Sequence, residues 1–128
     1  MYFRRAGSRW GIEGALIGYG NTLIAMKEYE MARECLKESY EIAIYLNDRY
    51  GSATIIESLA FLSLEAGNEI DAGKLLNTAK KIRDELKTPM SLVNKSMFGK
   101  SFDELMSDDR EILSIEAAIK IGLEMKIK

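Results

Sequence analysis

The chain has 128 residues, of which 47% are hydrophobic and 30% are charged, and its formal net charge is −2. This composition suits one folded domain over residues 1–128, and it shows no excess of basic residues for nucleic-acid binding. The single cysteine and the absence of histidine exclude an intrachain disulfide and the commonest general base and metal ligand.

A repeat with a period of 40 residues organises most of the chain. Ser8-Arg9-Trp10-Gly11 recurs as Asp48-Arg49-Tyr50-Gly51, and the same shift places Ala32 on Ala72. A repeat of this length indicates stacked supersecondary units that bury their apolar faces against one another.

Apolar residues at helical spacing predict four long helices, over about 10–26, 28–47, 50–66 and 69–87. Residues 1–8 align with the end of the second helix under the same shift, so the chain begins inside a repeat unit. We expect either that it is part of a longer protein or that its N-terminal edge is covered.

The C-terminal part of the chain is less regular. Its one proline ends the fourth helix, and residues 90–100 are apolar without a clear period, which predicts a short helix or a loop. Ser101-Phe102-Asp103-Glu104 has the pattern of a capping box and predicts a short helix, followed by a turn at 107–110. Ser114 is expected to cap a last helix that ends at about Met125.

Residues at matching spacings mark the two helix pairs. The first unit has Leu16-x₂-Tyr19-Gly20-x₂-Leu23 and Tyr29-x₂-Ala32-x₃-Leu36, and the second has Ile56-x₂-Leu59-Ala60 and Ala72-x₃-Leu76-x₂-Ala79. These spacings resemble the tetratricopeptide repeat, although the period is 40 residues and not 34. The resemblance implies an all-α, right-handed superhelix of antiparallel hairpins at about 10–47 and 50–87, closed by a C-terminal cap at about 90–128.

Four segments carry a second resemblance: Asp48-Arg49-Tyr50-Gly51, Glu57-Ser58-Leu59-Ala60, Ala72-Gly73-Lys74-Leu75-Leu76 and Leu113-Ser114-Ile115-Glu116-Ala117-Ala118. They are similar to the C-terminal helical repeats of large bacterial ATPase-type regulators, which include LuxR-type transcription factors and multidomain signalling ATPases. In that family the repeats form a sensor or interaction arm and not the catalytic part.

The resemblance also implies where a partner binds, because the first helix of each unit lines a concave surface in such arrays. By that pattern the binding residues are Gly14, Ile17, Asn21 and Ile24 in the first unit and Thr54, Glu57, Phe61 and Leu64 in the second. Asn21 and Glu57 would set the orientation of a bound peptide that buries the apolar residues. The alternative is that these residues pack beneath the C-terminal helix or a neighbouring molecule. The basic clamp that some family members use for a terminal carboxylate is absent, since no lysine stands at Ile17.

No group of residues has the pattern of a catalytic or metal site. Cys35 lies between acidic Glu34 and inward-facing Leu36, and the chain has no histidine to activate it, which favours a packing role. Asp108-Asp109 lacks the alternating ligands and the glycine of a calcium loop, so a solvated turn is the better interpretation. The glycine-rich stretch 14–20 lacks the strand and the Gly-Lys-Ser/Thr ending of a phosphate loop, which favours helix packing.

Trp10 aligns with Tyr50 in the repeat, and this favours a packing role over a ligand role. The basic residues near the two termini are not interleaved with aromatic residues, so we expect no contact with nucleic acid. No apolar run approaches the roughly 18 residues that span a bilayer, and the N-terminus has no long apolar segment of the kind found in signal peptides. A cytoplasmic protein without membrane contact is the expectation.

The sequence therefore predicts a non-enzymatic module, without a cofactor, that binds a protein or peptide segment. A module that forms a homodimer is the alternative, because Tyr2, Phe3 and Trp10 are expected to be exposed at the N-terminal edge and exposed apolar patches tend to be interfaces.

Overall fold

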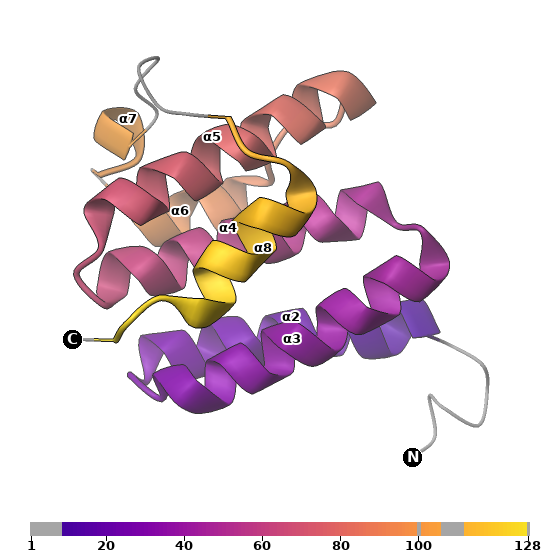
Figure 1. Cartoon of the computed structure of the whole chain (residues 1–128), viewed down its shortest axis with the longest axis horizontal. Coiled ribbons are helices and arrows are strands. Elements are labelled where there is room, and N and C mark those ends of the chain that lie inside the picture. Colours follow the sequence, from indigo (N-terminus) through magenta and orange to yellow (C-terminus); the bar gives the residue numbers. More distant parts are fainter. Residues whose placement is uncertain (1–8, 100, 106–111, 128) are drawn as a thin grey trace.

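The computed structural model describes residues 9–99, 101–105 and 112–127 (Figure 1). Every regular element in these ranges is an α-helix, which confirms the predicted all-α class. The helices are α2 (Arg9–Ala25), α3 (Tyr29–Leu46), α4 (Arg49–Glu65), α5 (Glu69–Leu86), α6 (Leu92–Phe98), α7 (Ser101–Leu105) and α8 (Ile115–Glu124). The helix predicted to end in residues 1–8 and the turn predicted at 107–110 lie outside the described residues.

The repeat seen in the sequence recurs in the helix boundaries. Helices α2 and α4 both have 17 residues and begin at equivalent positions, and α3 and α5 both have 18. The turns repeat as well, because Lys27 and its equivalent Gly67 both have positive φ, and so do Asn47 and its equivalent Lys87. Two antiparallel hairpins, α2–α3 and α4–α5, therefore end their helices with the same backbone conformations.

Helix α4 is the centre of the packing, and it contacts α2, α3, α5, α6 and α8. Every residue from Gly51 to Ser63 is buried except Thr54. Its neighbour α5 presents Ala72, Leu75, Leu76 and Ala79 to the same core. A helix that is apolar on most sides must be covered on most sides, and each neighbour of α4 supplies one of these covers.

Helix α8 is one of these covers, and it contacts α4 and α5 (Figure 1). Ser114 caps it as predicted, since its Oγ atom accepts a hydrogen bond from the backbone N–H of Ala117 at 3.1 Å. The approach to α4 is close at Gly122, where a Cβ atom would lie 2.7 Å from the Cβ of Leu59. Beside Gly122, at the C-terminal end of α8, the guanidinium of Arg33 in α3 donates to the carbonyl groups of Leu123 and Met125.

The segment without clear periodicity contains helix α6, which covers another side of α4. Ser91 caps this helix by accepting from the N–H of Asn94 at 3.1 Å. Phe98 at its end is buried and meets Phe61 of α4 edge to face, with ring centroids 6.1 Å apart. In the part of the chain that the structure describes, no helix is long and apolar enough to cross a bilayer.

Asn68 precedes α5 without a side-chain cap hydrogen bond, and its amide nitrogen donates to the carbonyl of Lys126 at 2.9 Å. The helix-packing interpretation of the glycine-rich stretch 14–20 is correct at only one of its three glycines. Close helix packing accounts for Gly20, whose missing Cβ would lie 3.2 Å from the side chain of Leu36, but nothing lies within 4 Å of such an atom at Gly14 or Gly18.

Candidate binding pocket between the two hairpins

An open pocket of about 440 Å³ lies between the parallel helices α2 and α4, near their N-terminal ends. We call it the α2–α4 pocket. It is lined by Trp10, Glu13, Gly14 and Ile17 of α2, by Asp48 before α4, and by Tyr50, Gly51 and Thr54 of α4. The equivalent starts of the two helices place these side chains opposite one another, so the pocket is a product of the repeat.

Glu13 is the unusual residue of this pocket, because its side chain is only 4% exposed. Burial, followed by a hydrogen bond to Asp48 and the negative charge of Asp48, raises the pKa of Glu13 from 4.5 to about 8. The Oε1 atom of Glu13 is buried and has no hydrogen-bond partner. Glu13 therefore keeps its proton at neutral pH, and one acceptor of its carboxyl group is unused.

Glycine at position 51 makes room for this carboxyl group. A Cβ atom there would lie closer than van der Waals contact to Oε2 of Glu13 and to the carboxylate of Asp48. Asp48 itself caps α4 by accepting from the N–H of Gly51 at 2.8 Å. One aspartate therefore begins the helix and holds the Glu13 carboxyl group at the wall of the pocket.

Two aromatic side chains flank the pocket and remain largely open to solvent. Trp10 is 70% exposed and Tyr50 is 53% exposed. The guanidinium of Arg83 in α5 lies over the ring of Tyr50, 4.6 Å from the ring centroid. The predicted packing role of Trp10 is therefore wrong in the structure, where the tryptophan stands at the pocket edge and outside the core.

Next to Thr54, the inner side of α4 holds a buried charged network instead of an open surface. Glu57 accepts two hydrogen bonds from Arg83, both at 2.9 Å, and a third from the side-chain amide of Asn94 in α6 at 2.9 Å. Arg83 also donates to the hydroxyl of Thr54 at 2.9 Å. Burial alone lowers the pKa of Arg83, but the hydrogen bonds and charge of Glu57 outweigh it and raise the pKa overall.

The structure divides the eight predicted binding residues into three groups. Gly14, Ile17 and Thr54 line the α2–α4 pocket. Glu57 and Phe61 are buried against α6, through Asn94 and Phe98. Ile24 is 1% exposed in the core, while Asn21 and Leu64 are half-buried.

The alternative given by the sequence places the predicted residues beneath the C-terminal helix or a neighbouring molecule. The cover over Glu57 and Phe61 is the short helix α6, and not the last helix. Neither residue is accessible to a partner in this conformation. The sequence analysis did not predict five of the pocket residues: Trp10, Glu13, Asp48, Tyr50 and Gly51. The repeated Arg-aromatic-Gly segment is the signal that could have identified this region.

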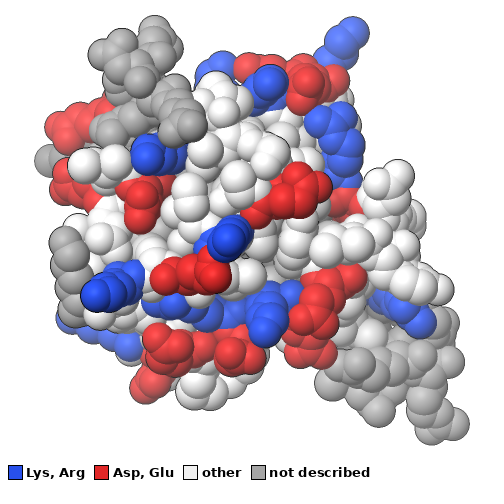
Figure 2. All heavy atoms as spheres, viewed as in Figure 1, with Lys and Arg blue, Asp and Glu red and all other residues white. Residues whose placement is uncertain are grey.

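The structure also shows the surroundings of Cys35, of the candidate metal ligands and of the charged surface residues. Burial and the nearby charges of Glu38 and Glu34 raise the pKa of the Cys35 thiol, which keeps it in the unreactive form. Among the described residues, no group of three or more carboxylates or thiols could hold a metal ion. Figure 2 shows acidic and basic side chains mixed across the face formed by α3, α5 and α8.

Comparisons with protein-family models, with curated proteins and with solved structures find no match for this chain.

Proposed function

We propose that the protein is an interaction module that binds a peptide segment of a partner protein in the α2–α4 pocket. The observation that carries this proposal is an open pocket between repeated helices, flanked by two exposed aromatic rings and containing an unused buried acceptor. Exposed aromatic side chains beside a concave site are typical of recognition surfaces.

The extent of the hollow favours a segment of chain over a small molecule. A second hollow of about 380 Å³ shares Trp10, Asp48 and Tyr50 with the first and continues to Leu86 and Thr88 at the end of α5. An extended peptide rises about 3.3 Å per residue and places alternate side chains on opposite sides. Two adjoining hollows therefore suit successive inward side chains of one segment.

The recurrence of hairpins at a fixed period supports a tetratricopeptide-like superhelix, in which the first helices of the units line the binding surface. On this proposal the module serves as the sensor or interaction arm of a cytoplasmic regulatory or signalling protein and has no catalytic role. Its binding surface is narrower than the sequence predicts, because α6 covers Glu57 and Phe61.

A matched pair of glycine substitutions tests the binding site. Gly14 and Gly18 are both exposed in α2, and neither has any atom within 4 Å of a Cβ position, but only Gly14 lines the pocket. Replacing either by Gln strengthens the helix by about 0.5–1 kcal/mol, so both variants are expected to fold.

The experiment selects binding peptides from a displayed random library with the wild-type chain and measures their affinities by calorimetry. Gly14→Gln is expected to weaken the selected peptides at least about tenfold, which corresponds to 1.4 kcal/mol, and Gly18→Gln is expected to leave them unchanged. Equal effects of the two substitutions, or no enrichment of any peptide, would contradict the proposal.

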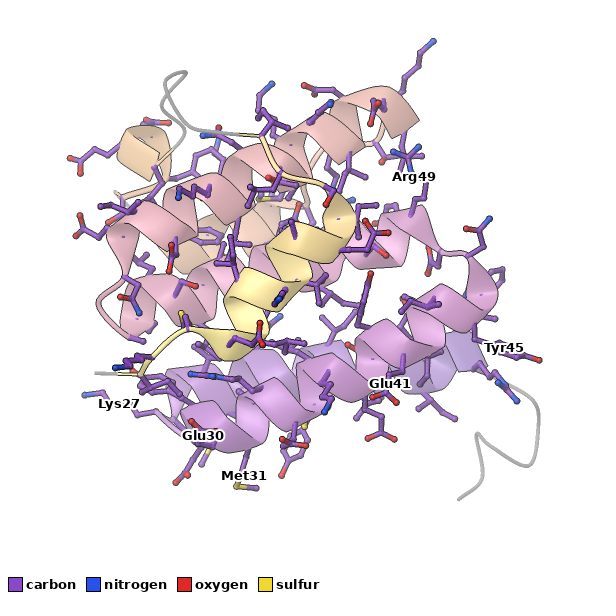
Figure 3. The ribbon with its side chains drawn as sticks, in the orientation of Figure 1. Lys27, Glu30, Met31, Glu41, Tyr45 and Arg49 are labelled. Carbon is purple, nitrogen blue, oxygen red and sulfur yellow. The ribbon has the colours of Figure 1, made fainter. Side chains whose placement is uncertain are left out.

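Self-association is a second candidate function, and one observation favours it. Exposed large apolar side chains gather on the first hairpin: Trp10, Tyr19, Met26, Met31, Ile44 and Tyr45. Figure 3 shows Met31 and Tyr45 of α3 pointing away from α4–α5, with the charged residues Lys27, Glu30 and Glu41 along the same edge. Such a surface is suited to a second copy of the chain.

A further inference from the structure

The α2–α4 pocket has a negative charge that nothing in its described surroundings neutralises. Neither Glu13 nor Asp48 takes part in a salt bridge among the described residues. The nearby cations are engaged elsewhere, since Arg83 pairs with Glu57 and Arg49 pairs with Glu85 at 3.0 Å. Arg9 lies over the ring of Tyr45, 3.9 Å from its centroid.

The geometry of the Glu13 carboxyl group makes this charge available to a ligand. Glu13 and Asp48 both line the pocket, and Glu13 is more than nine-tenths buried with Oε1 unpartnered. The last torsion of a glutamate is broad, so rotation about it, with loss of the hydrogen bond to Asp48, can turn a carboxyl oxygen toward a ligand in the pocket. A buried acceptor without a partner is unfavourable, and a donor brought by a ligand removes this penalty.

The exposed rings add a second element of recognition. Trp10 and Tyr50 lie at the mouth of the pocket, where they can cover the aliphatic part of a long side chain. Aromatic faces also attract an ammonium or guanidinium group, and because Arg83 already covers one face of Tyr50, the Trp10 ring is the one open to a ligand cation. The combination of flanking rings and an acidic floor matches the chemistry of lysine and arginine side chains.

We propose that the α2–α4 pocket receives the side chain of a lysine or arginine from the bound segment, with its cationic group hydrogen-bonded to Glu13 and Asp48. This inference rests on the proposed peptide-binding function and adds the chemistry of the residue that is recognised. Binding of the cation displaces the proton of Glu13, because the positive charge favours the ionised form of that carboxyl group. Affinity is therefore expected to rise as the pH is raised through about 8.

The test titrates the full chain with four probes. Three are blocked, alanine-based pentapeptides with lysine, arginine or norleucine at the central position, and the fourth is free propylamine. Backbone and indole N–H signals of Trp10, Gly14 and Gly51 report binding at the pocket by NMR. We expect the lysine and arginine peptides to bind at least about tenfold more tightly than the norleucine peptide, because only they supply a charged donor. Propylamine as tight as the lysine peptide would overturn the assignment to a partner's side chain.

Two substitutions and a change of pH separate this inference from the proposed function. Glu13→Gln preserves the shape of the side chain and is expected to weaken the lysine peptide at least about tenfold and to abolish the rise of affinity with pH. Glu41→Gln removes one exposed charge from α3, away from the pocket, and is the matched control, with no expected change.

The two proposals fail in different ways. One outcome is that library-selected peptides bind and respond to Gly14→Gln, while charge at the central residue and Glu13→Gln have no effect. In that case the cation inference is wrong, and the α2–α4 pocket is still supported as a peptide-binding site. If no peptide binds the chain at this face, the proposed function is wrong, and the cation inference is wrong with it.

Discussion

Two arginine–glutamate pairs join α4 to α5, and they differ in burial. Glu57 and Arg83 are both buried, whereas Arg49 and Glu85 are both exposed. Removing one member of a buried pair leaves an uncompensated charge, so Arg83→Met is expected to lower the free energy of unfolding by about 3–5 kcal/mol. Arg49→Met is expected to lower it by only about 0–1 kcal/mol. Urea unfolding at neutral pH measures both, and equal losses would show that burial does not distinguish the pairs.

Glu13 makes stability depend on pH. Its pKa rises from 4.5 to about 8 in the folded chain, so the folded state binds more protons than the unfolded state between these values. The free energy of unfolding therefore falls as the pH rises from about 4.5 to about 8. Glu13→Gln removes this term because its amide donates as the protonated acid does.

Thermal unfolding of Glu13→Gln and wild type over this range tests that expectation. The variant is expected to have the higher melting temperature above about pH 8, and the difference is expected to shrink as the pH is lowered. Glu41→Gln should follow the wild type at every pH. A constant difference between Glu13→Gln and the wild type would mean that the Glu13 proton is not retained on folding.

The roles of individual acidic residues were the least predictable part of the site. Helical spacing placed Glu57 on the inner side of α4, but the partners that bury it, Arg83 and Asn94, lie 26 and 37 residues away in the sequence. Glu13 and Asp48 meet only because two helices of different hairpins lie side by side. Periodicity reports which face a residue occupies, and it contains no information about which distant side chain arrives there.

At the scale of elements, the contact of α8 with α4 depends on a residue without a side chain. A Cβ atom at Gly122 would lie 2.7 Å from the Cβ of Leu59, and neither helix can relax without moving its backbone. Gly122→Ala is expected to destabilise the chain by about 1–3 kcal/mol. Gly18→Ala, in open space on α2, is expected to stabilise it by about 0.5–1 kcal/mol.

Chemical denaturation of the two alanine variants and the wild type makes this comparison. If Gly122→Ala stabilised the chain as Gly18→Ala does, helix propensity and not close packing would govern position 122. Circular dichroism of the folded variants would show whether helix content is retained in each.

The four long helices were predicted to within about two residues because each has an apolar periodicity and a turn that recurs in the repeat. Helix α6 was not predicted with the same clarity. It has seven residues, too few to be stable on local preference alone, and it depends on burial of Phe98 against Phe61. Its effect on the predicted binding surface therefore could not be foreseen from local pattern.

At the scale of the whole molecule, the exposed side of the first hairpin leads to a prediction about self-association. Met31 and Tyr45 are exposed on α3, and Tyr45 is 68% exposed. If this side joins two copies, sedimentation of the wild type should depend on concentration, and Met31→Glu combined with Tyr45→Glu should give a monomer. Leu92→Glu, which changes an exposed apolar residue of α6, is the control. A wild-type chain that stays monomeric at high micromolar concentration would remove self-association as a function.

The hydrogen bonds from Arg33 to the end of α8 have a consequence for how the protein unfolds. In a linear array each unit touches only its neighbours, so the outer units can fray while the middle stays intact. Here a guanidinium in the first hairpin holds carbonyl groups 90 and 92 residues further along the chain. The early and late parts of the chain are thereby tied to each other as well as to α4, and losing either one exposes groups on the other. We therefore expect the described helices to melt cooperatively, and not to lose one hairpin at a time from an end.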